Sequence, residues 1–231
     1  MFFFDRTMLL LLPAMAFAMW AQWKVQSTYN QWSRVRSSTG LTGRDMARRI
    51  MNINGVSDVE VEPVNGVLSD HYDPGARKVR LSMHNFNESS IASIAVAAHE
   101  VGHVLQHHSG YFPLTLRAGM VPVVGVATMA ATPLFFIGLL FNASMPFAGV
   151  LMDIGIVLFA GAVLFHLVTL PVEFDASRRA LAQLTNTGAV RPEEVSGAKK
   201  VLDAAALTYV AAAAVAALQL VRVLVLRNDR R

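Results

Sequence analysis

The sequence predicts a mainly α-helical, polytopic membrane protein with about four spans and a small α+β domain. Of its 231 residues, 54% are hydrophobic and the mean hydropathy is +0.42, which is too apolar for an ordinary soluble chain. The only sizeable polar region lies between apolar segments. We therefore divide the chain into an anchor (1–23), the polar domain (24–117), two spans (118–170), a charged helical stretch (171–203) and a last span with a basic tail (204–231).

The first apolar run, Met8–Ala21, is uncharged and ends beside Trp20 and Trp23, which suit a membrane interface. A cleaved signal peptide is the alternative, because Ala16-Phe17-Ala18 resembles a cleavage site. Positive charge after the run favours instead an uncleaved anchor whose C-terminal end is cytoplasmic. The basic residues concerned are Lys24, Arg34, Arg36, Arg44, Arg48 and Arg49.

Two helices are predicted in the polar domain. Thr42, with Asp45 three positions later, is typical of a helix start, and Asn54-Gly55 is typical of its end. Asn85 and Glu88 are expected to cap the second helix, which stops near Gly110.

Three short strands are predicted between these helices, at Val56–Val61, Val67–His71 and Lys78–Ser82. Turn residues separate them at Asn65-Gly66 and Asp73-Pro74-Gly75. A small antiparallel sheet is the expected result.

Three later segments are apolar enough to span, at Ala118–Phe141, Phe147–Leu170 and Ala204–Leu226. The link at 142–146 is short and would lie across the membrane from the polar domain. Arg222 interrupts the last segment, which is therefore the least secure crossing.

The second predicted helix of the polar domain contains His99-Glu100-Val101-Gly102-His103, a pattern of the form H-E-x-x-H. Residues four apart share one helix face, so two imidazoles can bind one metal ion with Glu100 beside them. Zinc binds imidazole well and lowers the pKa of a bound water molecule to about 7. A neighbouring carboxylate can then accept a proton from this water at neutral pH. A purely structural role would require two histidines and a glutamate to find partners on a largely apolar helix, so we favour the metal site.

Composition narrows the remaining choices. Cysteine is absent, which excludes a disulfide framework, a thiolate metal site and a catalytic thiol. We attribute the net charge of +4 to basic residues that set the membrane topology and contact anionic lipid. Nucleic-acid binding is a poor alternative explanation of this charge.

A catalytic zinc site normally has three protein ligands, so one more is needed. Two spans separate His103 from residues 171–203, which places both on one side of the membrane, whereas Asp153 is expected toward the other side. Glu173, at the end of the third span, is the best candidate, and its position alone fits a surface carboxylate at a membrane boundary equally well.

Several segments carry a resemblance that covers nearly the whole chain. Ala97–Gln106, Asp70–Pro74 and Leu170–Leu181, together with Leu41–Gly43 and Val201–Ala211, resemble the bacterial membrane zinc metallopeptidases of the YugP type. The resemblance implies a zincin-like, gluzincin-like peptidase in the bacterial plasma membrane, distantly similar to the HtpX and CAAX-prenyl endopeptidases.

In those relatives, a glutamate that opens an E-x-x-x-D pattern supplies the third ligand of one zinc ion, and this role falls on Glu173. Ser177 stands where the relatives have an aspartate that orients a ligand histidine. Asp175 would point elsewhere on a helix, so the partner of that histidine is left open.

Other polar residues are weaker candidates. His71, Tyr72 and Tyr209 could donate to a transition-state oxyanion. His107 lies roughly 12 Å along the helix from His99, too far to share an ion, and is expected near the site or on a polar face. His166 could border the site or be an ordinary interfacial histidine.

We therefore expect a zinc-dependent endopeptidase that acts on protein or peptide substrates beside a lipid bilayer, with its active site facing the cytoplasm. A substrate strand could pair with an edge of the sheet. The alternatives are a catalytically inactive zinc-binding membrane scaffold and, more weakly, a metal transporter. Nothing in the sequence predicts the oligomeric state.

Overall fold

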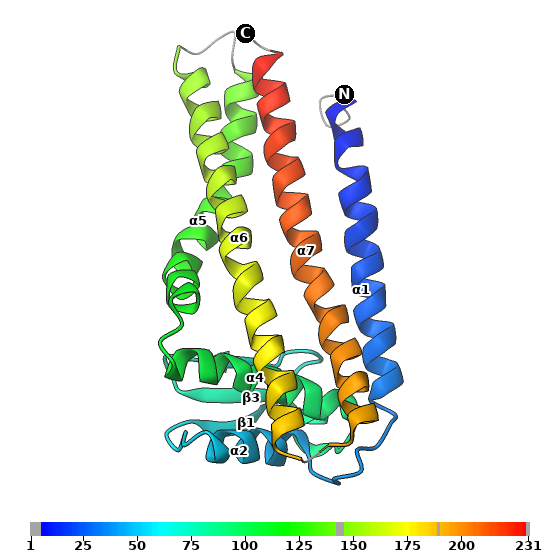
Figure 1. The fold of residues 1–231 in the computed structure, drawn as a ribbon. Helices are drawn as coiled ribbons and strands as arrows, with labels where there is room; N and C mark the ends of the chain where they lie inside the picture. The colour runs from blue at the N-terminus through cyan, green and yellow to red at the C-terminus, as the bar shows by residue number, and fades with distance from the viewer. Residues whose placement is uncertain (1–5, 142–145, 189, 230–231) are drawn as a thin grey trace. The chain divides into compact units, whose positions relative to one another are not determined.

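The computed structural model describes residues 6–141, 146–188 and 190–229, and most of them are helical (Figure 1). The elements are η1 (Arg6–Leu10), α1 (Leu12–Trp32), α2 (Gly43–Ile53), β1 (Glu60–Val64), β2 (His71–Asp73), β3 (Lys78–Ser82), α3 (Met83–Asn87), α4 (Ile91–His108), α5 (Phe112–Leu140), α6 (Ala148–Asn186) and α7 (Pro192–Asn228). Four of these helices exceed 20 residues, as expected for a chain of this hydropathy.

The chain forms two compact units, which we describe separately. Unit 1 consists of Met1–Ala21, Leu116–Leu170 and Thr208–Arg231, and unit 2 of Gln22–Thr115 and Pro171–Leu207. The small sheet and all of α2, α3 and α4 belong to unit 2.

Unit 1 has the character of a membrane domain. Within the described residues, three helices are long and apolar enough to cross a bilayer, namely α5, α6 and α7. Large apolar side chains on α5, among them Val123, Val126 and Met129, are exposed, as suits contact with lipid. Arg222 of α7 is buried, donates to Thr7 and lies over the ring of Phe136. The predicted loop at 142–146 lies outside the described residues except for Pro146.

Helices α6 and α7 each continue beyond the predicted span. We expected a separate charged stretch at 171–203, but α6 runs through Pro171 to Asn186 and α7 already begins at Pro192. The turn between them contains Gly188 with φ of +58°. Pro192 is the first residue of α7, a position at which a helix tolerates the missing N–H of proline.

The sheet of unit 2 is mixed, so the expectation of an all-antiparallel sheet is wrong for β1. The strand order is β1-β3-β2, with β1 parallel to β3 and β2 antiparallel to β3. Residues after Val64 do not form the predicted hairpin, because the Asp70 carboxylate accepts hydrogen bonds from Ser82 N and Asn85 Nδ2 and holds this stretch against the start of α3. The predicted turn after Asp73 does join two antiparallel strands.

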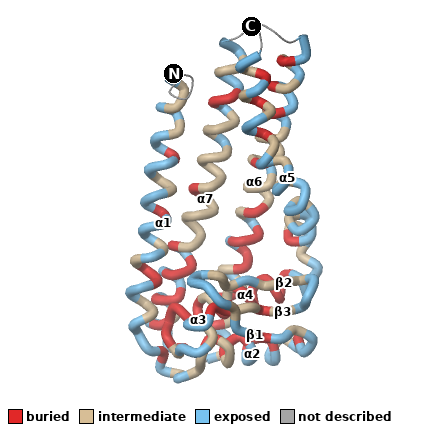
Figure 2. Tube along the Cα trace, turned by 180° about the vertical axis from the view of Figure 1, so that it is seen from behind, coloured by how far each residue is buried: buried red, intermediate tan, exposed pale blue. Residues whose placement is uncertain are grey.

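The core of unit 2 forms where α2 and α4 pack together beside the sheet (Figure 2). Thr42 caps α2 by accepting from Asp45 N, and Asn54 with Gly55 (φ +71°) ends it, as predicted. The apolar stripe of α2 is buried, as are Val79 and Leu81 of β3.

The predicted cap of α4 is wrong. Residues 83–87 form the separate short helix α3, so Glu88 ends α3 and Ser90 caps α4 by accepting from Ser93 N at 3.1 Å. Asn85 is instead buried between Tyr29 and Asp70. The end of α4 at His108, followed by Gly110 with φ of +65°, agrees with the prediction.

Candidate metal centre

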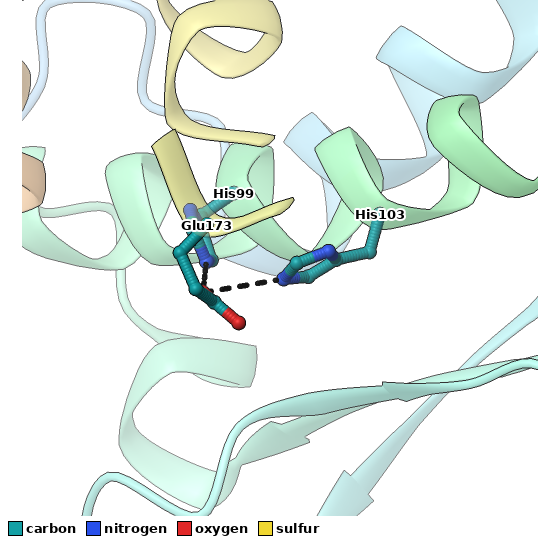
Figure 3. Close-up of side chains that lie close together, drawn as sticks. All are labelled: His99, His103 and Glu173. Carbon is teal, nitrogen blue, oxygen red and sulfur yellow. Dashed lines mark hydrogen bonds and ion pairs between the residues drawn. The ribbon is translucent and has the colours of Figure 1, made fainter. Parts of the chain in front are cut away.

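Three side chains from two helices of unit 2 converge on one point (Figure 3). His99 and His103 lie one turn apart on α4, and Glu173 comes from α6. Glu173 Oε2 is 3.3 Å from His99 Nε2 and 3.6 Å from His103 Nε2. One ligand atom from each residue lies within 4.8 Å of the other two.

These separations fit a shared ion better than direct hydrogen bonds. Hydrogen bonds between charged partners are usually about 2.7–2.9 Å long. Zinc ligands bound at about 2.0–2.1 Å with tetrahedral angles lie about 3.3 Å apart. The donor set of two imidazole nitrogens and one carboxylate oxygen is also one that zinc favours. The residues present therefore fit a zinc ion.

Gly102 lets the two helices approach closely enough for this convergence. A Cβ atom at Gly102 would lie 2.4 Å from the backbone oxygen of Ala176, which follows Glu173 by three positions on α6. Only glycine leaves room for this backbone contact. The glycine between Glu100 and His103 thus has a packing function that the sequence pattern alone did not indicate.

The charges of the cluster suit a cation. Burial alone would raise the pKa of Glu173, but interactions with His103 and His99 outweigh burial and hold this pKa well below its usual range. The carboxylate is therefore ionised, with only 2% of the residue exposed. Burial lowers the pKa of His103, but its interactions with Glu173 outweigh burial and raise it, so a metal ion would bind in place of an imidazole proton, with the carboxylate ionised and both imidazoles neutral.

Glu100 lies next to His99 on α4 and is buried, with 7% of its surface exposed. Burial raises the pKa of its carboxyl group, the neighbouring His99 and His103 oppose this, and the charge of Asp70 adds to it. A carboxylate with a raised pKa accepts a proton more readily, as a general base requires.

Each histidine has a partner at its other ring nitrogen. His99 Nδ1 is 3.1 Å from the hydroxyl of Ser177, so the serine occupies the place of the aspartate expected from the resemblance and still contacts this ring. His103 Nδ1 is 2.9 Å from Oε1 of Gln106, which the sequence analysis did not single out. Its position three residues after His103 on one helix was the signal that could have identified it.

We expected Asp175 to point elsewhere on the helix, away from the centre. Instead, its carboxylate lies close to it. Its carboxylate accepts from Gln106 Nε2 at 3.0 Å and from Arg179 Nε at 2.6 Å, and it also pairs with Arg178. Asp175 thus contacts the residue that holds His103.

The remaining candidates do not join the cluster. His71 Nδ1 lies 2.8 Å from Ser69 O, and Tyr72 Oη lies 2.8 Å from His107 Nδ1. Tyr72 and His107 line a cavity of about 230 Å³ with Asp58 and Arg77. Tyr209 belongs to unit 1.

Two further polar residues of the sequence analysis also belong to unit 1. Asp153 accepts from Arg227 at 2.9 Å, and the ring of His166 packs edge-on against Phe165. Neither is part of the cluster of His99, His103 and Glu173.

Within the described residues, three apolar helices and a cluster of a half-buried His99 with the buried His103 and Glu173 define a membrane protein with a candidate zinc site. Comparison with known proteins agrees with this class. The chain belongs to the family described as "Putative neutral zinc metallopeptidase", and the match covers residues 7–228. It is 49% identical over 222 residues to a protein of Bacillus subtilis (strain 168) named "Putative membrane protease YugP", with 96% of each chain covered. No solved structure matches the chain.

Proposed function

We propose that this protein is a membrane-embedded, zinc-dependent endopeptidase. His99, His103 and Glu173 hold a single zinc ion, and Glu100 is the general base. The observation that carries the proposal is the convergence of three ligand atoms within 4.8 Å beside a buried glutamate. The family description and the name of the Bacillus relative support it.

When bound, zinc supplies a Lewis acid that polarises a peptide carbonyl and lowers the pKa of water toward neutrality. Glu100 accepts a proton from the attacking water and passes it to the departing amine. Its burial supports this role, because the raised pKa of its carboxyl group favours holding the proton between the two transfers.

The substrate is an extended protein or peptide segment that adds to the sheet. β2 is an edge strand and lies beside α4, so its free side can pair with a substrate backbone close to the helix that carries Glu100. His71 and Tyr72 of this strand are the candidate donors to the oxyanion within unit 2.

We further propose a multi-pass protein of the bacterial plasma membrane, with α1 as a fourth span and the zinc site on the cytoplasmic side. The basic residues between Lys24 and Arg49 support this orientation. The proposed membrane-spanning segments are then the anchor at 1–23, the two spans within 118–170 and the last span from 204.

The test is Glu100→Gln in the purified, detergent-solubilised protein, with zinc content and casein cleavage measured together. We expect the wild type to contain zinc and to cleave casein, whereas the variant keeps the zinc and loses cleavage. Gln106 and the three ligands are unchanged in this variant, so normal cleavage would remove Glu100 from the mechanism. A wild type that holds zinc without cleaving casein or itself would assign the chain to the alternative class, an inactive zinc-binding scaffold.

A further inference from the structure

Gln106 is buried completely at the junction between α4 and α6, and every polar atom of its amide has a partner. Its Nε2 donates to Val172 O at 2.7 Å and to Asp175 Oδ2 at 3.0 Å. Its Oε1 lies 2.9 Å from His103 Nδ1. The two residues on α6 flank Glu173 on either side.

These contacts determine which way the amide faces. Val172 O and the Asp175 carboxylate can only accept hydrogen bonds, so the NH₂ group of Gln106 must face them. The amide oxygen then faces His103, and an oxygen can only accept. His103 Nδ1 must therefore carry a proton, so the neutral ring that a metal ion requires has its lone pair on Nε2, the atom that faces Glu173.

His99 has no equivalent constraint. Its Nδ1 contacts a serine hydroxyl, which can donate or accept and therefore fits either tautomer. The two histidines of the cluster are thus held differently, one by a rotatable hydroxyl and the other by an amide with a fixed direction.

We propose that Gln106 is a positioning residue that fixes the tautomer and orientation of His103 for metal binding and connects this ring to the negative charge of Asp175. The inference rests on the proposed zinc site but not on peptide cleavage. Asp175 is held in turn by Arg179, whose guanidinium also reaches Ser109 at the end of α4. The chain from His103 to Arg179 therefore ties the metal-binding turn of α4 to the turn of α6 that follows Glu173.

The test measures zinc affinity by competition with a chromophoric chelator in the full-length protein. Gln106→Met keeps the side-chain length and removes all three hydrogen bonds, so we expect affinity to fall about 10–100-fold. Gln183→Met is the matched control, because Gln183 is a helical glutamine, on α6, whose amide exchanges hydrogen bonds with Asn54 away from the cluster. We expect its zinc affinity to equal that of the wild type.

A double-mutant cycle separates positioning from a general loss of structure. Asp175→Asn should weaken zinc binding less than Gln106→Met does, and it should have no further effect when Gln106 is already Met. Equal effects of Asp175→Asn in both backgrounds would overturn the connection through Gln106. If Gln106→Met does not fold, Asp175→Asn alone must still weaken zinc binding, and unchanged affinity there would overturn the inference.

A spectroscopic signature completes the test. The cobalt-loaded wild type and Gln183→Met should share one ligand-field absorption spectrum, whereas Gln106→Met should shift it because the ring of His103 is no longer held. An identical spectrum together with unchanged zinc affinity in Gln106→Met would refute the role of Gln106. Failure of the wild type to cleave casein would instead count against the proposed function and leave these metal measurements intact.

Discussion

At the residue scale, the cluster includes both the candidate ligands and the side chains that contact them: Ser177 lies 3.1 Å from His99, and Gln106 lies 2.9 Å from His103. His99, Glu100 and His103 follow from helix periodicity, and Glu173 follows from the resemblance to known peptidases. Gln106 and Asp175 could not be assigned in this way, because their contacts depend on how two helices cross. The role of each of these residues in binding or catalysis stays a prediction.

Glu173→Ala removes the one carboxylate of the cluster, so we expect zinc affinity and peptide cleavage to fall together. Zinc content and casein cleavage are measured on the same preparation. Glu193→Ala is the control, because Glu193 is exposed in the first turn of α7. Its replacement should lower the stability by only about a few tenths of a kcal/mol. Full zinc occupancy in Glu173→Ala would transfer the ligand role to another acid, and Asp175 would be tested next.

At the scale of elements, local signals predicted helices better than strands. Thr42, Asp45 and Asn54-Gly55 fixed both ends of α2, because capping depends on neighbours in the sequence. β1 pairs with β3 and not with the next strand along the chain, so its partner is not determined by neighbouring residues. Pro63 gives a local hint, since a strand that contains proline is confined to a sheet edge, and β1 is indeed an edge strand.

Gly102→Ala tests the close contact between α4 and α6. The added methyl group would meet the backbone of Ala176, so we expect the helices to separate, stability to fall by about 1–3 kcal/mol and zinc to bind more weakly. Chemical denaturation of the metal-free protein and chelator competition provide the two measurements.

Gly161→Ala is the matched control, because Gly161 lies on α6 and an added Cβ would meet no atom within 4 Å apart from the backbone of its own helix. This change should be neutral or stabilising by up to about 1 kcal/mol, as expected for glycine in a helix interior. If the two alanine variants behave alike, the contact at Gly102 does not hold the cluster together.

At the scale of the whole molecule, hydropathy indicated a helical membrane protein, and three apolar helices agree with it. The number of spans could not be settled by composition, because the first apolar run is short and Arg222 interrupts the last one. Within α6 and α7, the apolar segments and the polar stretches belong to single helices.

The orientation of the chain is tested with single cysteines, which are informative because the natural sequence has none. Ser57 and Ser196 are both exposed in unit 2, and Ser144 belongs to the link outside the described residues. In intact cells, an impermeant thiol reagent should label a cysteine at 144 and spare those at 57 and 196. Labelling at only one of these last two would contradict a site shared by His99 and Glu173.

The distance along the chain between the two halves of the cluster has a consequence for synthesis. His99 and Glu173 are 74 positions apart, so at about 5–20 residues per second the third ligand follows the first after roughly 4–15 s. During that interval the ribosome produces α5 and most of the apolar part of α6. A nascent chain that ends at Leu170 should therefore bind zinc weakly and cleave nothing, and tight binding by this truncated chain would contradict the expectation. The complete metal site of the proposed function would then form only after the apolar segments before Glu173 have been made.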